Sequence, residues 1–140
     1  FLLRLALGYP DESAERALLA GSDRRALIAQ AAPLLDAQRV IALRRMVLEV
    51  HASEPLIAYV QALVGRSRKH PGVRVGLSPR AGLALLRAAR AHALLLGRSH
   101  AIPEDVQALF AAVAEHRLVG EADTAAATLA KAILHAVPVD

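Results

Sequence analysis

The stretch SPRAGLALLRAARAHALLLG, residues 78–97, decides the class of fold. Ser78 is a favoured residue for capping the start of a helix, Pro79 suits the first helical position, and Gly97 is suited to ending one. Between these points apolar residues occupy most of the helix circumference, which is typical of a helix covered by others. The segment therefore predicts a central helix over residues 78–96 with further helices packed around it.

The flanking segments carry the same two signals, a capping side chain followed by apolar residues at helical spacing. We expect helices over residues 11–20, 37–50, 53–69, from 103 onward and 124–137, with a less clear one over 22–32; the expected caps are Asp11, Asp23, Asp36, Ser53 and Asp123. The side chains expected to face inward are Val40, Leu43, Val47, Val50, Leu56, Val60, Leu63, Val64, Val106, Leu109, Phe110 and Val113.

Two short segments have the pattern of strands. Residues 1–8 are mostly apolar and end at the turn signal Gly8-Tyr9-Pro10, so we expect a strand whose partners lie in an upstream domain or in a small local sheet. Residues 73–76 alternate in polarity and predict a tiny strand, which pairs with residues 48–52 or with nothing. The expected fold class is therefore all-α in the main, a helical bundle with one or two short strands.

The composition narrows the class of protein further. The chain has 140 residues, which is the size of one domain. Hydrophobic residues make up 55% of it but aromatic residues only 3%, so the core must consist of Leu, Ala, Val and Ile, a mixture that favours helices. The absence of cysteine excludes disulfides, thiolate metal ligands and cysteine nucleophiles, and it fits a reducing compartment.

The charge is basic and comes almost wholly from arginine, because Lys69 and Lys131 are the only lysines. The net charge of +4 means that acidic partners have to be considered, although a GC-rich genome explains much of the arginine content. The opening apolar run is interrupted by Arg4, is too short to cross a bilayer and lacks the layout of a secretory signal. We therefore expect a soluble fragment of a larger protein, with no membrane partner.

No complete catalytic or metal-binding pattern occurs in the sequence. The six histidines show no i, i+4 pairing and no HExxH motif, which disfavours a zinc site. There is no GxSxG motif and no glycine-rich phosphate loop. Glu104 and Asp105 stand where the start of a helix favours negative charge, so helix stabilisation explains them. We expect no metal site in this chain.

One local feature points to a ligand. The sequence Gly76-Leu-Ser-Pro-Arg80 places Arg80 in the first turn of the central helix, where free N–H groups and the helix dipole attract anions. A cation costs about 0.3–1 kcal/mol at that end of an exposed helix, and an outside anion would offset this cost. Arg87 follows on nearly the same face. The sequence Ser78-Pro79-Arg80 alone is weak evidence for a ligand site, because many helices start with Ser-Pro and surface arginines are common.

Four short motifs occur along the chain in an order that is more informative than any one of them alone. Gly76-Leu-Ser-Pro-Arg80, Gly97-Arg98, Pro103-Glu-Asp-Val106 and His116-Arg117 together resemble the C-terminal signature of MoxR-type AAA+ ATPases. Upstream, Phe1-Leu-Leu-Arg-Leu and Gly8-Tyr-Pro10 resemble the segment in which that family's ATPase core passes into its helical lid. The likeness runs in order from Phe1 to about Leu118, and the last helix matches only loosely.

This resemblance implies a division of the chain. Residues 1–10 would be the last strand and the hinge of an ATPase core that is otherwise missing here, with Tyr9 and Pro10 at the hinge. Residues 11–140 would be the lid. Arg80 would be the sensor-2 arginine, which reaches from the lid to the γ-phosphate of bound ATP.

The same resemblance implies that Ser78 and Pro79 set the start of the helix and so the direction of the Arg80 side chain, and that Gly76 lets the backbone turn. The family's core supplies the Walker A lysine, the Walker B carboxylates that accompany Mg, and an arginine finger in a motif of which only Phe1 would remain. The fragment itself should therefore neither bind ATP tightly nor hydrolyse it.

The resemblance also implies a cytoplasmic, ring-forming, hexameric parent, in which this lid contacts its own core and neighbouring subunits. The parent would resemble a chaperone-like remodeller that acts with a partner carrying a von Willebrand factor A-type domain. The sequence departs from the family pattern at two positions, one in the loop before Arg80 and one at the start of the helix from residue 103. Leu77 stands where a small residue is common, and Ile102 stands where Ser or Thr often caps the helix.

Two other classes of function remain open at this stage. Residues 81–110 have a helix-turn-helix look with Arg66, Arg68 and Lys69 nearby, which suggests a basic nucleic-acid-binding module. The acidic pair Glu104-Asp105 and the scarcity of aromatic residues argue against nucleic acid. The third class is a protein-interaction module, and the cluster at residues 66–70 is expected to be a solvated helix end.

Overall fold

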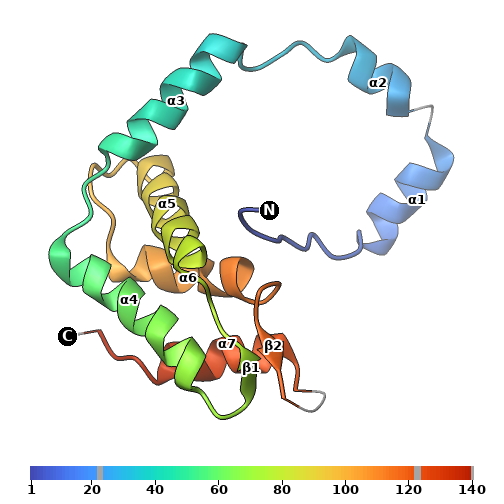
Figure 1. The fold of residues 1–140 in the computed structure, drawn as a ribbon. Helices are drawn as coiled ribbons and strands as arrows, with labels where there is room; N and C mark the ends of the chain where they lie inside the picture. Colours follow the sequence, from blue (N-terminus) through green and yellow to red (C-terminus); the bar gives the residue numbers. More distant parts are fainter. Residues whose placement is uncertain (22–23, 122–123, 140) are drawn as a thin grey trace.

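The computed structural model describes residues 1–21, 24–121 and 124–139. Along the chain it contains α1 (Glu12–Ala20), α2 (Arg24–Gln30), α3 (Ala37–Glu49), α4 (Glu54–Lys69), β1 (Val73–Val75), α5 (Pro79–Leu95), α6 (Pro103–Ala114), β2 (Val119–Gly120) and α7 (Ala126–His135). The expected mainly helical class with short strands is confirmed. Helices α4 to α7 form a packed body, and α1 to α3 leave it as an arc (Figure 1).

The central position of α5 comes from small residues on its buried face. Helix α5 contacts α3, α4 and α6, and its buried residues include Gly82, Ala88 and Ala89. A Cβ atom at Gly82 would lie 3.2 Å from Cγ2 of Val64, so glycine lets α4 approach closely. The outer side of α5 is not covered, since Leu83 is 67% exposed.

Helices α4, α6 and α7 supply the rest of the core. The residues of α4 that the pattern placed inside, Leu56, Val60, Leu63 and Val64, are all buried. In α6 the predicted Val106, Phe110 and Val113 are buried and Leu109 is partly buried. Leu129, Ala130 and Ile133 complete the core from α7.

The small sheet pairs segments that the sequence did not connect. Strand β1 runs antiparallel to β2, with Val73 opposite Gly120 and Val75 opposite Val119. The expected partner of residues 73–76, the segment 48–52, instead meets the loop after α5, where the N–H of His51 donates to the carbonyl of Ser99 at 2.8 Å. Both alternatives for residues 73–76 are therefore wrong. The turn after α6 brings residues 119–120 beside β1, a contact across more than forty residues that local pattern does not reveal.

The helices of the arc, α1 to α3, have capping residues that the sequence predicts, but few of their side chains are buried. Asp11 caps α1 by accepting from the N–H of Ala14 at 2.8 Å, and Asp36 caps α3 by accepting from Arg39 at 2.7 Å. None of the residues of α1, all of which are described, is buried. The expected caps Asp23 and Asp123 lie outside the described residues.

The apolar stripe of α3 is covered only at its end. Val50, just after the helix, is buried and Val47 is partly buried, but Val40 and Leu43 are exposed. The prediction that this whole stripe faces inward is therefore wrong for its first half. Helix α3 meets α5 at its far end and diverges from the body before it (Figure 1).

Residues 1–10 form neither a helix nor a strand. The strand expected over residues 1–8 is absent because no described segment pairs with it as a sheet. An upstream domain, the other expected partner, is not part of this chain, so the boundary at residue 10 stays a prediction. Across the described part of the chain, we find no helix with the length and apolar character needed to cross a membrane.

Candidate functional site

Arg80 lies at the second position of α5 and is exposed. Ser78 caps this helix, since its side-chain oxygen accepts from the N–H of Ala81 at 3.3 Å, and Pro79 occupies the first turn as predicted. Among the described residues no carboxylate or carbonyl oxygen pairs with the Arg80 guanidinium. A cation thus stands at the positive end of a helix without an acidic partner, an arrangement that suits an anion from outside.

The loop before Arg80 is fastened to the end of α4. The Ser67 hydroxyl donates to the carbonyl of Val64 at 2.7 Å and accepts from the N–H of Leu77 at 2.9 Å. Nε of Arg68 donates to the carbonyl of Leu77 at 2.8 Å. Both backbone polar groups of Leu77 are therefore held by α4, and its side chain is buried in the core. The start of α5 has a fixed position relative to α4.

Gly76 has a different role from the expected turn. Its backbone does not adopt a positive φ, which among the described glycines occurs at Gly8 and Gly97. A Cβ atom at Gly76 would instead lie 2.8 Å from Cα of Arg68 and 2.8 Å from the carbonyl oxygen of Ser67. Glycine is needed here because the loop passes against the α4 backbone.

Sequence reasoning missed Ser67 and Arg68, which fall within the cluster expected to be a solvated helix end. Ser67 is 0% exposed. One signal was present in the sequence: Ser67 lies three and four residues after Val64 and Leu63, so it shares the buried face of α4. That its hydroxyl reaches Leu77 depends on how α4 and α5 pack.

Asp105 joins the end of α5 to the start of α6. Its carboxylate accepts from Nη1 and Nη2 of Arg98 at 2.8 and 2.5 Å and from the N–H of Ile102 at 2.9 Å, and it lies 2.6 Å from Nδ1 of His92. Burial alone raises the pKa of Asp105, but the hydrogen bonds from Arg98, Ile102 and His92 hold it well below its usual range. At the start of α6, Asp105 thus satisfies the N–H of Ile102, although Ile102 supplies no side-chain cap to the helix.

The expected hinge residues lie apart from this arrangement. Tyr9 and Pro10 are exposed and stand between the first residues of the chain and α1. No hydrogen bond links them to the loop before Arg80 within the described residues. Their role as a hinge stays a prediction.

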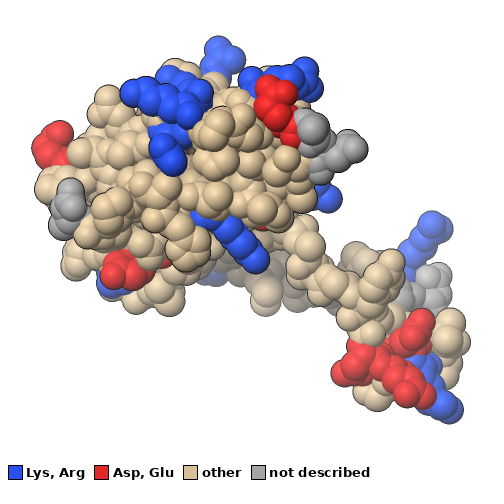
Figure 2. Space-filling model, turned by 90° about the horizontal axis from the view of Figure 1, so that it is seen from below, with Lys and Arg blue, Asp and Glu red and all other residues tan. Residues whose placement is uncertain are grey.

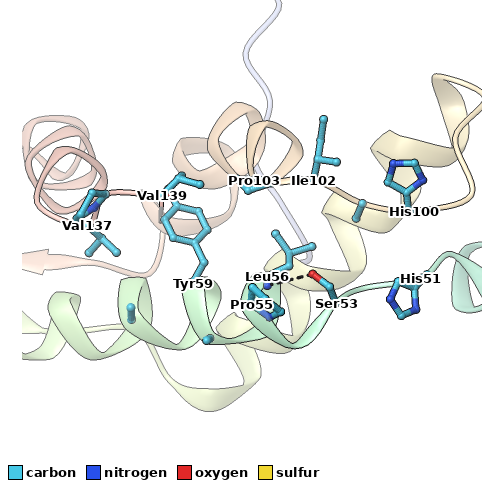
Figure 3. A pocket seen from close by; sticks show the side chains of 14 residues that line it. His51, Ser53, Pro55, Leu56, Tyr59, His100, Ile102, Pro103, Val137 and Val139 are labelled. Atoms are coloured by element: carbon cyan, nitrogen blue, oxygen red, sulfur yellow. Dashed lines mark hydrogen bonds between the residues drawn. The ribbon is translucent and has the colours of Figure 1, made fainter.

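A hollow on the body lies apart from the predicted site. It encloses about 730 Å³ between the start of α4, the loop at residues 100–103 and the segment after α7. Figure 3 shows Tyr59, Leu56 and Val139 around it, with His51 and His100 at one end. Arg80 is not among its lining residues, and the described residues contain no cluster of three potential metal ligands.

Comparison with known proteins identifies the family of this chain. Residues 65–136 match the AAA lid domain family. The uncharacterised protein YeaC of Bacillus subtilis is 35% identical over 119 residues, which are 85% of this chain and 37% of that protein. The chaperone MoxR1 of Mycobacterium tuberculosis is 31% identical over 128 residues, 85% of this chain and 33% of that protein. The chain thus spans about a third of the length of these curated relatives.

A solved structure shows the same fold. The crystal structure of a candidate ATPase from Cytophaga hutchinsonii matches the whole chain with a TM-score of 0.82 at 22% sequence identity, and the match covers 47% of that protein. The family match extends over α5 and α6, which carry Arg80 and the Asp105 contacts. The chain belongs to the AAA lid domain family, as the helical lid of a MoxR-type AAA+ protein.

Proposed function

We propose that this lid presents Arg80 to the terminal phosphate of an ATP molecule held by an ATPase core outside the chain. The observation that carries the proposal is the exposed Arg80 guanidinium at the start of α5, unpaired among the described residues. The hydrogen bonds of Ser67 and Arg68 to Leu77 support it, because they fix the helix start from which Arg80 projects. Phosphoryl transfer depends mainly on such positioned cations.

The division of labour follows from what the chain contains. Arg80 would orient and neutralise the terminal phosphate, while Ser78 and Pro79 set its direction and Gly76 allows the close passage of the loop over α4. The core would supply the Walker lysine and the carboxylates that hold Mg with ATP. Residues 1–10 would lead out of that core, with Tyr9 and Pro10 at the hinge, and residues 11–140 would form the lid.

For the complete protein we propose a cytoplasmic ring, hexameric as the family resemblance implies, that acts as a chaperone-like remodeller. The similarity to a relative described as a chaperone supports this proposal. The partners would be the core of the same chain, the neighbouring subunits and a protein with a von Willebrand factor A-type domain. The client would be recognised by parts of the protein outside this chain.

The test uses the complete protein with Arg80→Ala. We expect kcat for ATP hydrolysis to fall about 10²-fold or more, because a charge-stabilising donor is removed from the transferring phosphate. Arg87→Ala is the matched control, since Arg87 is an exposed arginine on the same helix, and it should retain turnover. Circular dichroism should show both variants folded. Unchanged turnover in Arg80→Ala would overturn the assignment.

The basic face of the body favours nucleic acid as the alternative ligand. Figure 2 shows Lys and Arg side chains gathered along one side of the body with a few acidic side chains among them, and a mixed group of acidic and basic side chains on the part that carries α1. Asp105, which argued against nucleic acid at the sequence level, is buried and paired, so only Glu104 still opposes phosphate at the start of α6. A gel-shift titration at low and moderate salt distinguishes the two ligands, because phosphate contacts give salt-dependent binding. No shift at low salt removes the alternative.

A further inference from the structure

The first residues of the chain are tied to the far end of α6. The N–H of Arg4 donates to the carbonyl of Ala112 at 2.8 Å. The guanidinium of Arg117 donates through Nη2 to the carbonyl of Leu2 at 3.0 Å and also to that of Phe1. The Leu3 side chain packs against the core. We call residues 1–4 the strap.

The attachment uses groups that a helix end leaves free. The last carbonyls of an α-helix have no N–H partner further along the helix, so they bind whatever donor is near. In α6 the carbonyl of Ala112 is satisfied by the strap, and that of Val113 accepts from Nη1 of Arg117. Arg117 therefore caps the helix with one nitrogen and holds the strap with the other, which its planar fork of donors permits.

The strap changes which part of the chain is free to move. Residues 5–36 leave the body and return to it through α3, which contacts α5 (Figure 1). Both ends of this arm are thus attached to the body, while α1 has no buried residue. A bend at Tyr9 and Pro10 would move the arm and leave the strap where it is.

We propose that Arg117 is a positioning residue that fastens the polypeptide entering at Phe1 to α6. The strap and the body of α4 to α7 then move as one unit, and the freedom of movement lies in residues 5–36. This inference rests on the proposed function at one point, the placing of an ATPase core upstream of Phe1. Movement between the body and that core is then not taken up at Tyr9 and Pro10, so this inference replaces the hinge role proposed above for those two residues.

The distance between strap and body tests the proposal directly. Since this chain has no cysteine, spin labels can be placed at Leu2→Cys in the strap and at Leu95→Cys in the body of the complete protein, with cysteines elsewhere replaced by serine. Both positions are exposed. We expect one narrow distance distribution, unchanged between the nucleotide-free, ADP-bound and AMP-PNP-bound protein. A second pair, Leu19→Cys with Leu95→Cys, reports on the arm and should change between these states.

Four variants separate the strap contacts from other roles of the same residues. Arg117→Ala removes the guanidinium, and Arg4→Pro removes the N–H that binds Ala112; each should abolish the narrow distribution of the first pair. Arg4→Ala keeps that N–H and removes only an exposed side chain, so it should leave the distribution unchanged. Arg117→Lys should give a distribution of intermediate width, because a single ammonium group cannot bind both the Val113 carbonyl and the strap as the two guanidinium nitrogens do.

Two results would overturn the proposal. One is a wild-type strap distance that shifts with nucleotide, and the other is a narrow distribution that survives in Arg117→Ala. These outcomes are distinct from failure of the proposed function. Normal turnover in Arg80→Ala would remove the sensor assignment without altering the strap distance.

Discussion

At the scale of single residues, Asp105 is the one charged residue that is buried among those the structure describes. Its side chain is 1% exposed and its partners all favour the ionised form. We expect Asp105→Asn to lower the free energy of unfolding by about 1.5–3 kcal/mol, the range for hydrogen bonds to charged groups. The partner Arg98 is a quarter exposed and can turn to water, which keeps the loss below that of a fully buried pair. Urea unfolding of the chain measures it.

The pH dependence of stability gives the same residue a second signature. The folded state holds the pKa of Asp105 below its usual value, so the unfolded chain, with a pKa of about 3.9, takes up the proton first. The contribution of Asp105 is present above about pH 5 and is lost as the pH falls below about 4. The difference between wild type and Asp105→Asn should therefore shrink at low pH. An equal difference at all pH values would contradict the account.

At the scale of elements, the contact between α4 and the loop before α5 decides where Arg80 points. Gly76→Ala places a methyl group against the backbone of Ser67 and Arg68, so the loop must move and the bonds to Leu77 must lengthen. We expect a loss of about 1–3 kcal/mol in stability, as for overpacking, together with reduced ATP turnover in the complete protein. Thermal unfolding and a turnover assay measure the two effects.

Gly65→Ala is the matched control for that substitution. Gly65 lies inside α4, where a Cβ would meet no atom within 4 Å. Replacing glycine by alanine in a helix interior should stabilise the chain by about 0.5–1 kcal/mol. If Gly76→Ala behaved like this control, the close passage of the loop over α4 would not constrain Arg80.

The elements that the sequence predicted well are those specified by neighbouring residues. Asp11, Asp36, Ser53 and Ser78 each cap a helix that begins where the pattern placed it. The partner of β1, the exposure of the first half of α3 and the bonds of Ser67 were not predictable, because each depends on a segment distant in sequence. The candidate site divides in the same way. A local motif predicts Arg80, whereas the roles of Ser67 and Arg68, which hold its loop, depend on how α4 packs against α5.

At the scale of the whole molecule, the contrast between the body and the arc predicts uneven stability. Helix α1 has nine residues and none of them is buried, whereas α4, α5 and α6 share one core. Isolated helices shorter than about 12–15 residues are marginal in water, so α1 needs a surface to pack against. The exposed leucines Leu18 and Leu19 are suited to such a surface.

Hydrogen exchange can show whether the complete protein provides that surface. In the 140-residue chain we expect α1 amides to exchange at nearly unprotected rates while those of α5 exchange only through larger openings. In the complete protein an ATPase core packed against α1 should slow its exchange, and Leu19→Ser should reverse that slowing without affecting α5. Equal protection of α1 in the chain and in the complete protein would mean that the arc has no partner there. The ATPase core would then have to contact the lid through the strap and the start of α5, where Arg80 stands.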